Sequence, residues 1–394
     1  EAQTIQILQH LALGLEQQYN MLIVYPAIRE IVNLTARYIP SQMFPKKAID
    51  MLHEAVSYVR SIKEKVVLSQ HIAKVVSEKT QIPIGKLETK EKSTLLNLEE
   101  LIHQRIVNQK EAVEQISIAM RRARAGIASK KRPMGVFLFL GPTGVGKTET
   151  AKALAEIYFT GENKMIRLDM SEFQTVQDIP RLIGAINPVE EQGLLTTPVR
   201  ERPFSLILLD EIEKAHKNIL NLFLQVFDEG HITDGQGRKV VFTNTIIICT
   251  SNAAASLIFK SVDEGKELNR DDLLHYLFEQ DIFRPEFINR FDSTVIFHPL
   301  TRENLMAIAQ LNLGSLQKSL KEKDIAFAIT NLLKEKVVEL SYKPEFGARE
   351  MRRVIQEKIE NKVAEALLSD RIVKGDSFEI NPENFELIIL KKNT

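Results

Sequence analysis

Residues 141–148 combine three glycines with a lysine and a threonine in a pattern that suits the binding of phosphate groups. Glycines let the backbone wrap closely round phosphates with its N–H groups pointing inward, and a following helix adds the positive end of its dipole. In this pattern the lysine reaches the β- and γ-phosphates, and the threonine hydroxyl ligates Mg²⁺. The sequence therefore predicts a site for ATP and Mg²⁺ formed by Gly141, Pro142, Thr143, Gly144, Val145, Gly146, Lys147 and Thr148.

Two acidic residues, Asp210 and Glu211, directly follow the apolar run 205–209. If that run is a buried strand, both carboxylates lie at the carboxyl edge of a sheet, where α/β proteins bind ligands. Asp210 would hold Mg²⁺ through water, and Glu211 would polarise the attacking water as a general base. The alternative is a solvated acidic turn at the end of a strand. With the glycine-rich loop upstream, the pair predicts an ATPase that hydrolyses its nucleotide.

Asn252 follows another apolar run, residues 245–250. It could donate a hydrogen bond to the γ-phosphate or hold the lytic water. Asparagine also ends strands for reasons of turn geometry, so both interpretations stay open at this stage.

The apolar pattern predicts a scaffold for these side chains. Five short apolar runs alternate with helical segments between residues 94 and 299, namely 136–140, 165–168, 206–209, 245–250 and 294–297. Continuous apolarity indicates strands covered on both faces, hence a mostly parallel sheet with flanking helices. Residues 1–85 show helical spacing only, residues 86–93 are typical of an exposed polar linker, and residues 300–394 are helical with a strand pair at 377–380 and 385–390.

The predicted fold is an α/β phosphate-loop NTPase with a mostly parallel five-stranded sheet. A helical subdomain precedes it, and a small, mainly helical α+β lid domain follows. The chain begins inside an amphipathic helix, which suggests a fragment of a longer protein.

Composition limits the partners to be expected. The 394 residues carry 52 basic and 52 acidic side chains, so no bulk attraction to nucleic acid or an anionic membrane is expected. No apolar run approaches the roughly 20 residues of a membrane span, and the N-terminus lacks a secretory signal. The single cysteine, Cys249, excludes an internal disulfide and fits a reducing compartment. These features predict a cytoplasmic protein with no nucleic-acid or membrane partner, in which Cys249 is a small core residue.

Several segments occur together, and in order, that resemble the second ATPase module of the Clp-type AAA+ unfoldases, the ClpA, ClpB and ClpC group. They are residues 141–148, 168–173, 208–216, 233–238, 250–252, 283–290 and 347–349. The resemblance covers nearly all of residues 94–394 and is greatest to ClpB members. Residues 36–40 and 44–50 resemble the small helical subdomain that ends the first module of the same proteins, with Lys46 where the family usually carries an aspartate.

The resemblance implies further roles at matching positions. Arg290 corresponds to the arginine finger that reaches the ATP of a neighbouring subunit, and Arg349 to the sensor arginine of the small domain. Asn252 corresponds to the polar sensor, while Ile106 and Val107 would flank the adenine. An arginine fork stabilises charge on the transferring phosphoryl group, which fits these assignments. A finger acting between subunits implies a homo-oligomer, a hexameric ring, acting on unfolded or aggregated polypeptide.

Three departures from the family bear on function. The loop that usually grips polypeptide corresponds to residues 184–195, which contain no aromatic residue; Ile186 and Val189 could provide a weaker apolar contact in its place. Residues 59–76 lack the heptads of the ClpB coiled-coil insertion. Residues 253–269 lack the short Gly-containing tripeptide with which related proteins dock a peptidase, so no peptidase partner is expected.

Three functions follow from these patterns. The leading one is an ATP-dependent unfoldase or disaggregase that threads polypeptide through a ring, with loops near 184–193 and 230–238 moving the substrate. The altered loop favours a rival, a regulatory or assembly ATPase that remodels one partner without threading. A nucleotide-dependent scaffold that scarcely hydrolyses is the third, and Glu211 and Arg290 argue against it.

Overall fold

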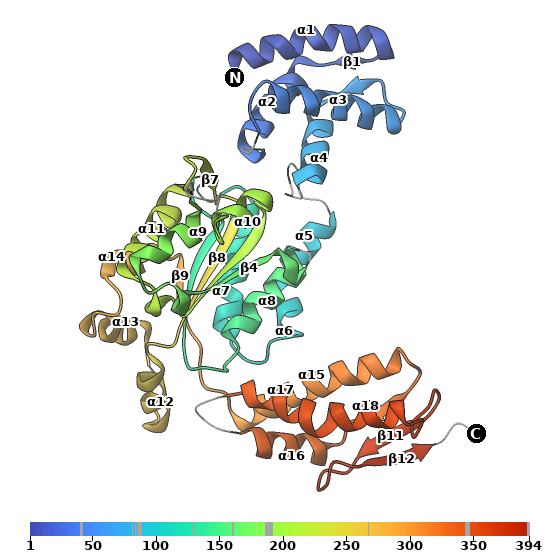
Figure 1. Ribbon diagram of the computed structural model, residues 1–394, viewed down its shortest axis with the longest axis vertical. Coiled ribbons are helices and arrows are strands. Elements are labelled where there is room, and N and C mark those ends of the chain that lie inside the picture. Colours follow the sequence, from blue (N-terminus) through green and yellow to red (C-terminus); the bar gives the residue numbers. More distant parts are fainter. Residues whose placement is uncertain are drawn as a thin grey trace.

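The computed structural model describes residues 1–39, 42–80, 82, 84, 89–127, 129, 131–159, 161–185, 192–266, 268–342 and 347–391. An N-terminal helical body, a central α/β body and a C-terminal lid follow one another along the longest axis of the molecule (Figure 1). The central body therefore has a neighbour at each end, and it carries the predicted nucleotide site.

Four helices form the N-terminal body: α1 (Ala2–Tyr19), α2 (Tyr25–Tyr38), α3 (Lys46–Ser61) and α4 (Ser69–Thr80). Pro26 lies in the first turn of α2, where backbone N–H groups have no partner within the helix, so its missing N–H costs no helix hydrogen bond. Leu8, Ile31, Met51 and Ile72, one from each helix, are fully buried in a shared core. Two short parallel strands, β1 (Leu22–Ile23) and β2 (Val66–Val67), also pair here, whereas the sequence predicts helices only. Two residues are too short a run to show a strand period.

Five parallel strands form the central sheet in the order β4-β5-β8-β3-β9. Their bounds are β3 (Gly135–Leu140), β4 (Met165–Asp169), β5 (Ser205–Asp210), β8 (Thr245–Ser251) and β9 (Ser293–Ile296). Every residue of β3 and β8 is buried, which explains why both segments are continuously apolar. The sheet confirms the predicted α/β fold class. Because β3 runs parallel to its neighbours β8 and β9, the loop that follows it lies at the carboxyl edge of the sheet together with the ends of those strands.

Alternate residues of each strand face two different layers of helices. Phe137 and Phe139 pack with α6 (Leu98–His103), α7 (Lys110–Arg124) and α8 (Lys147–Tyr158). Leu138 and Leu140 face the opposite layer. That layer consists of α9 (Ile179–Ile183), α10 (Thr196–Glu201), α11 (Lys217–Glu229), α12 (Ala255–Asp263), α13 (Arg270–Glu279) and α14 (Pro285–Ile288). The resulting three layers hold the carboxyl edge of the sheet in a fixed place.

The polar stretch predicted as a linker, residues 86–93, differs from that expectation from residue 89 on, because α5 (Thr89–Leu96) begins there. Glu91 accepts hydrogen bonds of 2.6 and 2.9 Å from the Arg124 guanidinium of α7, and one of 3.2 Å from the Tyr158 hydroxyl of α8. Arg124 and Tyr158 are distant from Glu91 in the chain, so the polar composition of residues 86–93 does not indicate these hydrogen bonds. Residues 85–88 lie outside the described residues.

The lid contains α15 (Arg302–Lys321), α16 (Asn331–Ser341), α17 (Arg349–Ile355) and α18 (Asn361–Leu368), with a π-helical turn, Gln356–Glu360, between the last two. The predicted strand pair is present as β11 (Ser377–Ile380) and β12 (Leu387–Lys391), which run antiparallel. A third strand, β10 (Ala326–Ala328), lies parallel to β11 and is not predicted by the sequence. Its three residues are again too few for a period.

Two features of the composition can be placed in the fold. Cys249 is completely buried in β8, and burial raises the pKa of its thiol, so it is an inert core residue as expected. Among the residues that the structure describes, no helix combines the length and apolar character needed to cross a bilayer.

Candidate nucleotide site

The glycine-rich loop joins the end of β3 to the start of α8. Gly144 and Gly146 have φ values of 77° and 108°, a left-handed conformation that residues with a Cβ rarely adopt. Gly146 is the residue before α8, whose first-turn N–H groups have no partner within the helix and face the loop. A Cβ added at Gly141 would come within 2.5 Å of the Phe297 carbonyl oxygen, so glycine is required for this close approach to the residue that follows β9.

Lys147 is the most strongly perturbed group of the loop. Its side chain is only 7% exposed, and its ammonium donates to the carbonyl oxygens of Gly141 and Pro142 at 2.6 and 2.7 Å. A third hydrogen bond, of 2.7 Å, goes to Asn252 Oδ1. Burial lowers the pKa of Lys147 to about 8, although nearby carboxylates raise it. All three donors are therefore aimed at oxygen acceptors in the loop and at the edge of the sheet.

The predicted carboxylates stand where β5 ends. The Thr250 hydroxyl of β8 donates to Asp210 Oδ1 and accepts a hydrogen bond of 3.2 Å from the Glu211 N–H. Asp210 Oδ2 accepts a bond of 2.7 Å from Arg167 of β4. Glu211 itself has a left-handed backbone, with φ of 54°, which turns its side chain away from the strand direction.

The surroundings of Glu211 suit a general base. Its partial burial raises its pKa, and the negative charges of Glu213, Asp169 and Asp210 raise it further against the opposing charge of Lys214. A carboxylate with a raised pKa accepts a proton more readily near neutral pH.

Asn252 connects the two halves of the site. Its Oδ1 accepts from Lys147, and its Nδ2 lies 3.5 Å from Glu211 Oε1. The Asn252 N–H donates to Glu213 Oε1 at 3.0 Å, while Glu213 Oε2 is buried with no hydrogen-bond partner. The structure thus brings together Lys147, Asp210, Glu211 and Asn252, which the sequence singled out. Glu213 and Thr250 fall within segments that resemble the family, and Arg167 does not, but the sequence gives no indication of the hydrogen bonds that any of the three forms.

Ile106 and Val107, the residues predicted to flank adenine, lie between α6 and α7, where Ile106 is buried and Val107 half-buried. Gln109 fastens this segment to the loop, since its Nε2 donates to the Val145 carbonyl oxygen at 3.1 Å. The sequence includes Gln109 in the same segment but gives no indication of this bond.

The lid touches the loop directly. The Ala348 N–H donates to the Gly144 carbonyl oxygen at 3.1 Å, and a Cβ at Gly347 would lie 2.7 Å from that oxygen. Gly347 also has a left-handed φ of 55°. Arg349, the predicted sensor arginine, is the first residue of α17 and is exposed. The lid arginine therefore directly follows the residue whose backbone bonds to the phosphate loop.

Arg290 lies at the other edge of the sheet. It precedes β9, and the next residues reach the start of β3, where the Asp292 N–H donates to the Val136 carbonyl oxygen at 2.8 Å. A strand of the length of β3 spans roughly 20 Å, so Arg290 stands far from the loop at the other end of β3. Its guanidinium Nε lies 2.8 Å from Asp228 Oδ2 and remains 45% exposed. The structure does not bring Arg290 to the nucleotide site of its own chain.

The two loops predicted to move substrate meet at their bases. The Gly235 N–H donates to the Ile183 carbonyl oxygen at 3.1 Å, and a Cβ at Gly235 would collide with the Gly184 backbone. Gly235 belongs to the turn between β6 (His231–Thr233) and β7 (Lys239–Val241), which pair antiparallel. Ile186 and Val189 lie outside the described residues.

The donor set fits a magnesium–nucleotide complex. A buried ammonium, a helix N-terminus and a glycine-rich backbone suit phosphate oxygens, and Thr148 and Asp210 offer side-chain oxygens of the kind that Mg²⁺ prefers. Among the described residues no three His, Cys, Asp or Glu side chains group as a metal cage. Mg²⁺ does not need one, because it is usually bound by one or two carboxylates together with substrate phosphates.

Fold and site together define the class as an AAA+ phosphate-loop protein. Residues 132–294 match the family model described as AAA domain (Cdc48 subfamily). Residues 300–380 match the C-terminal, D2-small domain of ClpB protein, and residues 1–113 match an AAA lid domain. The chain belongs to the Clp-type AAA+ family, which confirms the resemblance carried by its motifs.

Individual relatives support this placement. The chaperone protein ClpB of Rhodopirellula baltica is 44% identical over 335 residues, which cover 84% of this chain and 38% of the relative. The negative regulator of genetic competence ClpC/MecB of Bacillus subtilis is 37% identical over 458 residues, covering 98% and 56% of the two chains. That alignment is longer than the chain itself, so the ClpC relative carries segments that this chain lacks.

Solved structures of Hsp104 have the same fold. The closed state of Hsp104 with ATPγS and FITC casein superimposes with a TM-score of 0.83 and 32% identity, covering 99% of this chain and 68% of Hsp104. The S. cerevisiae Hsp104–ADP complex gives a TM-score of 0.76 and 31% identity, over 100% and 69% of the chains. The chain spans between about a third and three fifths of the curated relatives it matches.

Proposed function

We propose that this chain hydrolyses ATP and uses the energy to unfold or disaggregate polypeptides. The observation that carries the proposal is the hydrogen-bonded line from Lys147 through Asn252 to Glu211, with Asp210 beside it. It places a phosphate-binding cation and a general base on either side of one polar side chain. A nucleotide-binding scaffold without hydrolysis has no use for that arrangement.

The chemical step follows from these positions. Lys147 would exchange its bonds to the loop carbonyls for bonds to the β- and γ-phosphate oxygens of ATP. Thr148 and Asp210 would hold Mg²⁺, which would supply positive charge to the phosphate oxygens. Glu211 would accept a proton from a water held by Asn252 as the water oxygen bonds to the γ-phosphorus. The bond to the β–γ bridging oxygen breaks, leaving ADP and phosphate.

Assembly into a ring supplies the missing arginine. Arg290 lies roughly one strand length from its own phosphate loop, which supports a contribution to the site of a neighbouring chain instead. A head-to-tail contact that repeats in this way closes into a ring when its rotation returns to the first chain, and we propose a closed hexamer. Arg349 would reach the γ-phosphate from the lid of the same chain. ATP would then bridge the central body, the lid and the neighbour, and hydrolysis would release that bridge.

The substrate we propose is unfolded or aggregated polypeptide, moved by the loops around 184–193 and 230–238 in the cytoplasm. The Hsp104 structure with casein supports this class of substrate. No nucleic acid, membrane or peptidase partner is proposed. We assign residues 1–85 to a helical subdomain, 94–299 to the nucleotide-binding domain and 300–394 to the lid.

A second function is favoured by one observation. Residues 184–193 hold no aromatic side chain to grip a threaded chain. A regulatory ATPase that remodels a dedicated partner without threading does not need one. The two functions differ in the range of proteins on which they act.

The test is ATP-dependent recovery of a heat-aggregated reporter enzyme by the protein, with Glu211→Gln as the inactive control. Recovery that requires Glu211 supports the unfoldase. ATP turnover without recovery of any of several unrelated reporters would instead support the dedicated remodelling function, and no turnover at all would contradict both.

A further inference from the structure

The Gln109 side chain joins the phosphate loop to the strand end from which the lid departs. Its Nε2 donates to the carbonyl oxygens of Val145, in the loop, and of His298, each at 3.1 Å. Its Oε1 accepts from the His298 N–H at 3.3 Å. Gln109 is 4% exposed, so these bonds form without competition from water. One amide group thus holds two segments that are distant in the sequence.

Asn108 makes a second connection, to the lid itself. Its Nδ2 donates to Asn304 Oδ1 at 3.2 Å. Asn304 lies in the first turn of α15, where it and Thr301 cap the helix through reciprocal hydrogen bonds. Asn108 therefore contacts the first turn of the lid while Gln109 contacts the connection that leads to it.

The backbone at both positions is unusual. Asn108 and Gln109 have φ values of 64° and 57°, two consecutive left-handed residues that both carry a Cβ. Such conformations are unfavourable and persist only where the surrounding contacts hold them. We call the pair Asn108–Gln109, with its bonds to Val145, His298 and Asn304, the clasp.

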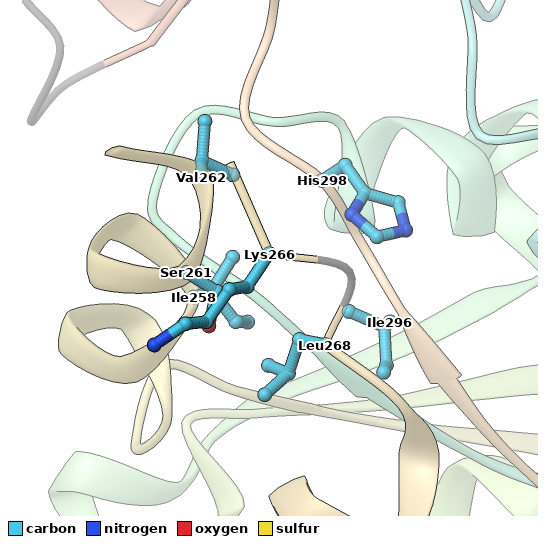
Figure 2. Close-up of a pocket in the computed structure, with 7 residues that line it drawn as sticks. All are labelled: Ile258, Ser261, Val262, Lys266, Leu268, Ile296 and His298. Atoms are coloured by element: carbon cyan, nitrogen blue, oxygen red, sulfur yellow. The ribbon is translucent and has the colours of Figure 1, made fainter. Parts of the chain in front are cut away.

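The connection that the clasp holds has room to move. Phe297 still bonds to β3, through its N–H to the Leu140 carbonyl oxygen at 2.7 Å, and α15 begins at Arg302. A cavity of about 120 Å³ lies against His298. Figure 2 shows His298 on one side of it and Ile258, Ser261 and Val262 of α12 on the other. Because His298 is exposed and Val262 is 52% exposed, this hollow lies at the surface, and the connection can shift into it without displacing packed core side chains.

We propose that the clasp couples the conformation of the phosphate loop to the position of the lid, and that Gln109 is a positioning residue for ATP hydrolysis. When phosphates move the loop at Val145, the bonds of Gln109 carry the displacement to His298 and hence to α15. The lid then brings Arg349 toward the γ-phosphate. This inference rests on the proposed function, because it concerns the delivery of Arg349 to the same site.

A coupling role and a simple packing role for Gln109 predict different losses of function when the residue is replaced. If Gln109 only packs, its replacement lowers stability and nucleotide affinity together. If it couples, a variant without its hydrogen bonds still binds nucleotide through the intact loop but fails to move the lid. The kcat for ATP then falls while KM changes little.

The variants are Gln109→Met, which keeps the length of the side chain without its hydrogen bonds, and Asn108→Gly, which accepts the left-handed backbone but loses the bond to Asn304. Gln317→Met is the matched control, because Gln317 donates at 2.6 Å to the Phe327 carbonyl oxygen and so joins α15 to β10 within the lid, without linking the lid to the central body. Thermal unfolding of all three identifies any variant that is merely unstable.

Lid movement is measured by energy transfer between dyes at Glu114→Cys, on α7, and Leu368→Cys, which is 88% exposed at the end of α18. The natural Cys249 is buried and stays unlabelled. Fluorescent ADP gives the affinity for nucleotide, and ATPγS gives the change in energy transfer. Steady-state turnover gives kcat and KM.

We expect Gln109→Met to bind ADP within about threefold of the parent, to lose most of the ATPγS-induced change in transfer, and to lose roughly tenfold in kcat, a typical size for an altered coupling. We expect a smaller loss of lid response and of kcat in Asn108→Gly, and no loss of either in Gln317→Met. A normal lid response in Gln109→Met would contradict coupling through the clasp. A loss of lid response accompanied by an equal fall in ADP affinity would contradict it as well. The lid response is measured without turnover, so the clasp remains testable even if the parent protein fails to hydrolyse ATP.

Discussion

Lys147 and Arg290 lie at opposite edges of the same parallel sheet. Lys147 follows β3 at the carboxyl edge, and Arg290 precedes β9, whose first residue pairs with Phe137 of β3. Because all five strands run in one direction, no rearrangement of side chains can bring the two together within one chain. Under the proposed function, one chain would therefore provide two half-sites that face away from each other, one with the phosphate loop and one with the arginine.

Asp228 is expected to hold Arg290 ready for its neighbour. Replacement of Asp228 by Asn removes the 2.8 Å ion pair. An exposed pair contributes at most about 1 kcal/mol, so the free energy of unfolding should hardly change. ATP turnover should nevertheless fall several-fold, because the guanidinium is no longer fixed. Glu286→Gln, which removes the exposed pair with Arg284 nearby, is the control and should leave turnover unchanged. Equal turnover in both variants would show that the pair does not position Arg290.

Glu213 is expected to position Asn252. In Glu213→Ala the Asn252 N–H loses its acceptor at 3.0 Å, and a buried unpaired donor costs about 1–3 kcal/mol. We expect kcat for ATP to fall at least about tenfold, with a smaller effect on ADP affinity. Glu213→Gln keeps an acceptor oxygen and should retain more activity than Glu213→Ala. The interpretation fails if both variants turn over ATP at the rate of the parent.

Gly347 is expected to be essential for contact between lid and loop. Gly347→Ala places a Cβ 2.7 Å from the Gly144 carbonyl oxygen on a left-handed backbone. The loop or the lid must shift, so ATP affinity and turnover should both fall. Gly314→Ala is the matched control: Gly314 lies inside α15 with open space at its Cβ, and alanine there should stabilise by about 0.5–1 kcal/mol. Calorimetric titration of nucleotide and thermal unfolding measure both effects, and unaltered affinity in Gly347→Ala would contradict the contact.

Asp234 should make the stability of the β6–β7 turn depend on pH. Burial alone would raise the pKa of Asp234, but hydrogen bonds from Arg238 and from the Gln236 N–H outweigh it and lower the pKa from its ordinary 3.8. A carboxyl group with a lowered pKa stabilises the fold above its unfolded pKa, and that stability disappears as pH falls through the folded value. The difference in unfolding free energy between the parent and Asp234→Asn should therefore be constant near neutral pH and shrink below about pH 4. Asp370→Asn, an exposed position, is the control. A difference that stays constant down to pH 2 would contradict this role.

The sequence predicts the parts of the site that depend on local pattern. A buried strand followed by three spaced glycines, Lys147 and Thr148 leaves few alternatives, and parallel strands must bring Asp210 and Asn252 to the same edge. The structure brings Lys147, Asp210, Glu211 and Asn252 together as that reasoning predicts, while their catalytic roles remain predictions.

What the sequence misses depends on contacts between distant segments or on very short elements. Gln109 bonds to residues 36 and 189 positions away, which no local pattern reveals. The strands β1, β2 and β10 have two or three residues and show no period. From sequence alone the polar start of α5 resembles a linker. The structure shows that Arg124 and Tyr158 donate hydrogen bonds to Glu91 in this helix.

The central claim is that each active site combines Glu211 of one chain with Arg290 of another, and mixing two inactive variants tests it most directly. Glu211→Gln and Arg290→Ala are assembled separately and then exchanged in equal amounts while ATP turnover is followed. A shared site predicts that each variant alone is inactive and that the mixture recovers up to about a quarter of parental turnover, because that fraction of interfaces pairs an intact Glu211 with an intact Arg290. A mixture that exchanges subunits yet stays as inactive as its components would contradict the shared site, and with it the ring.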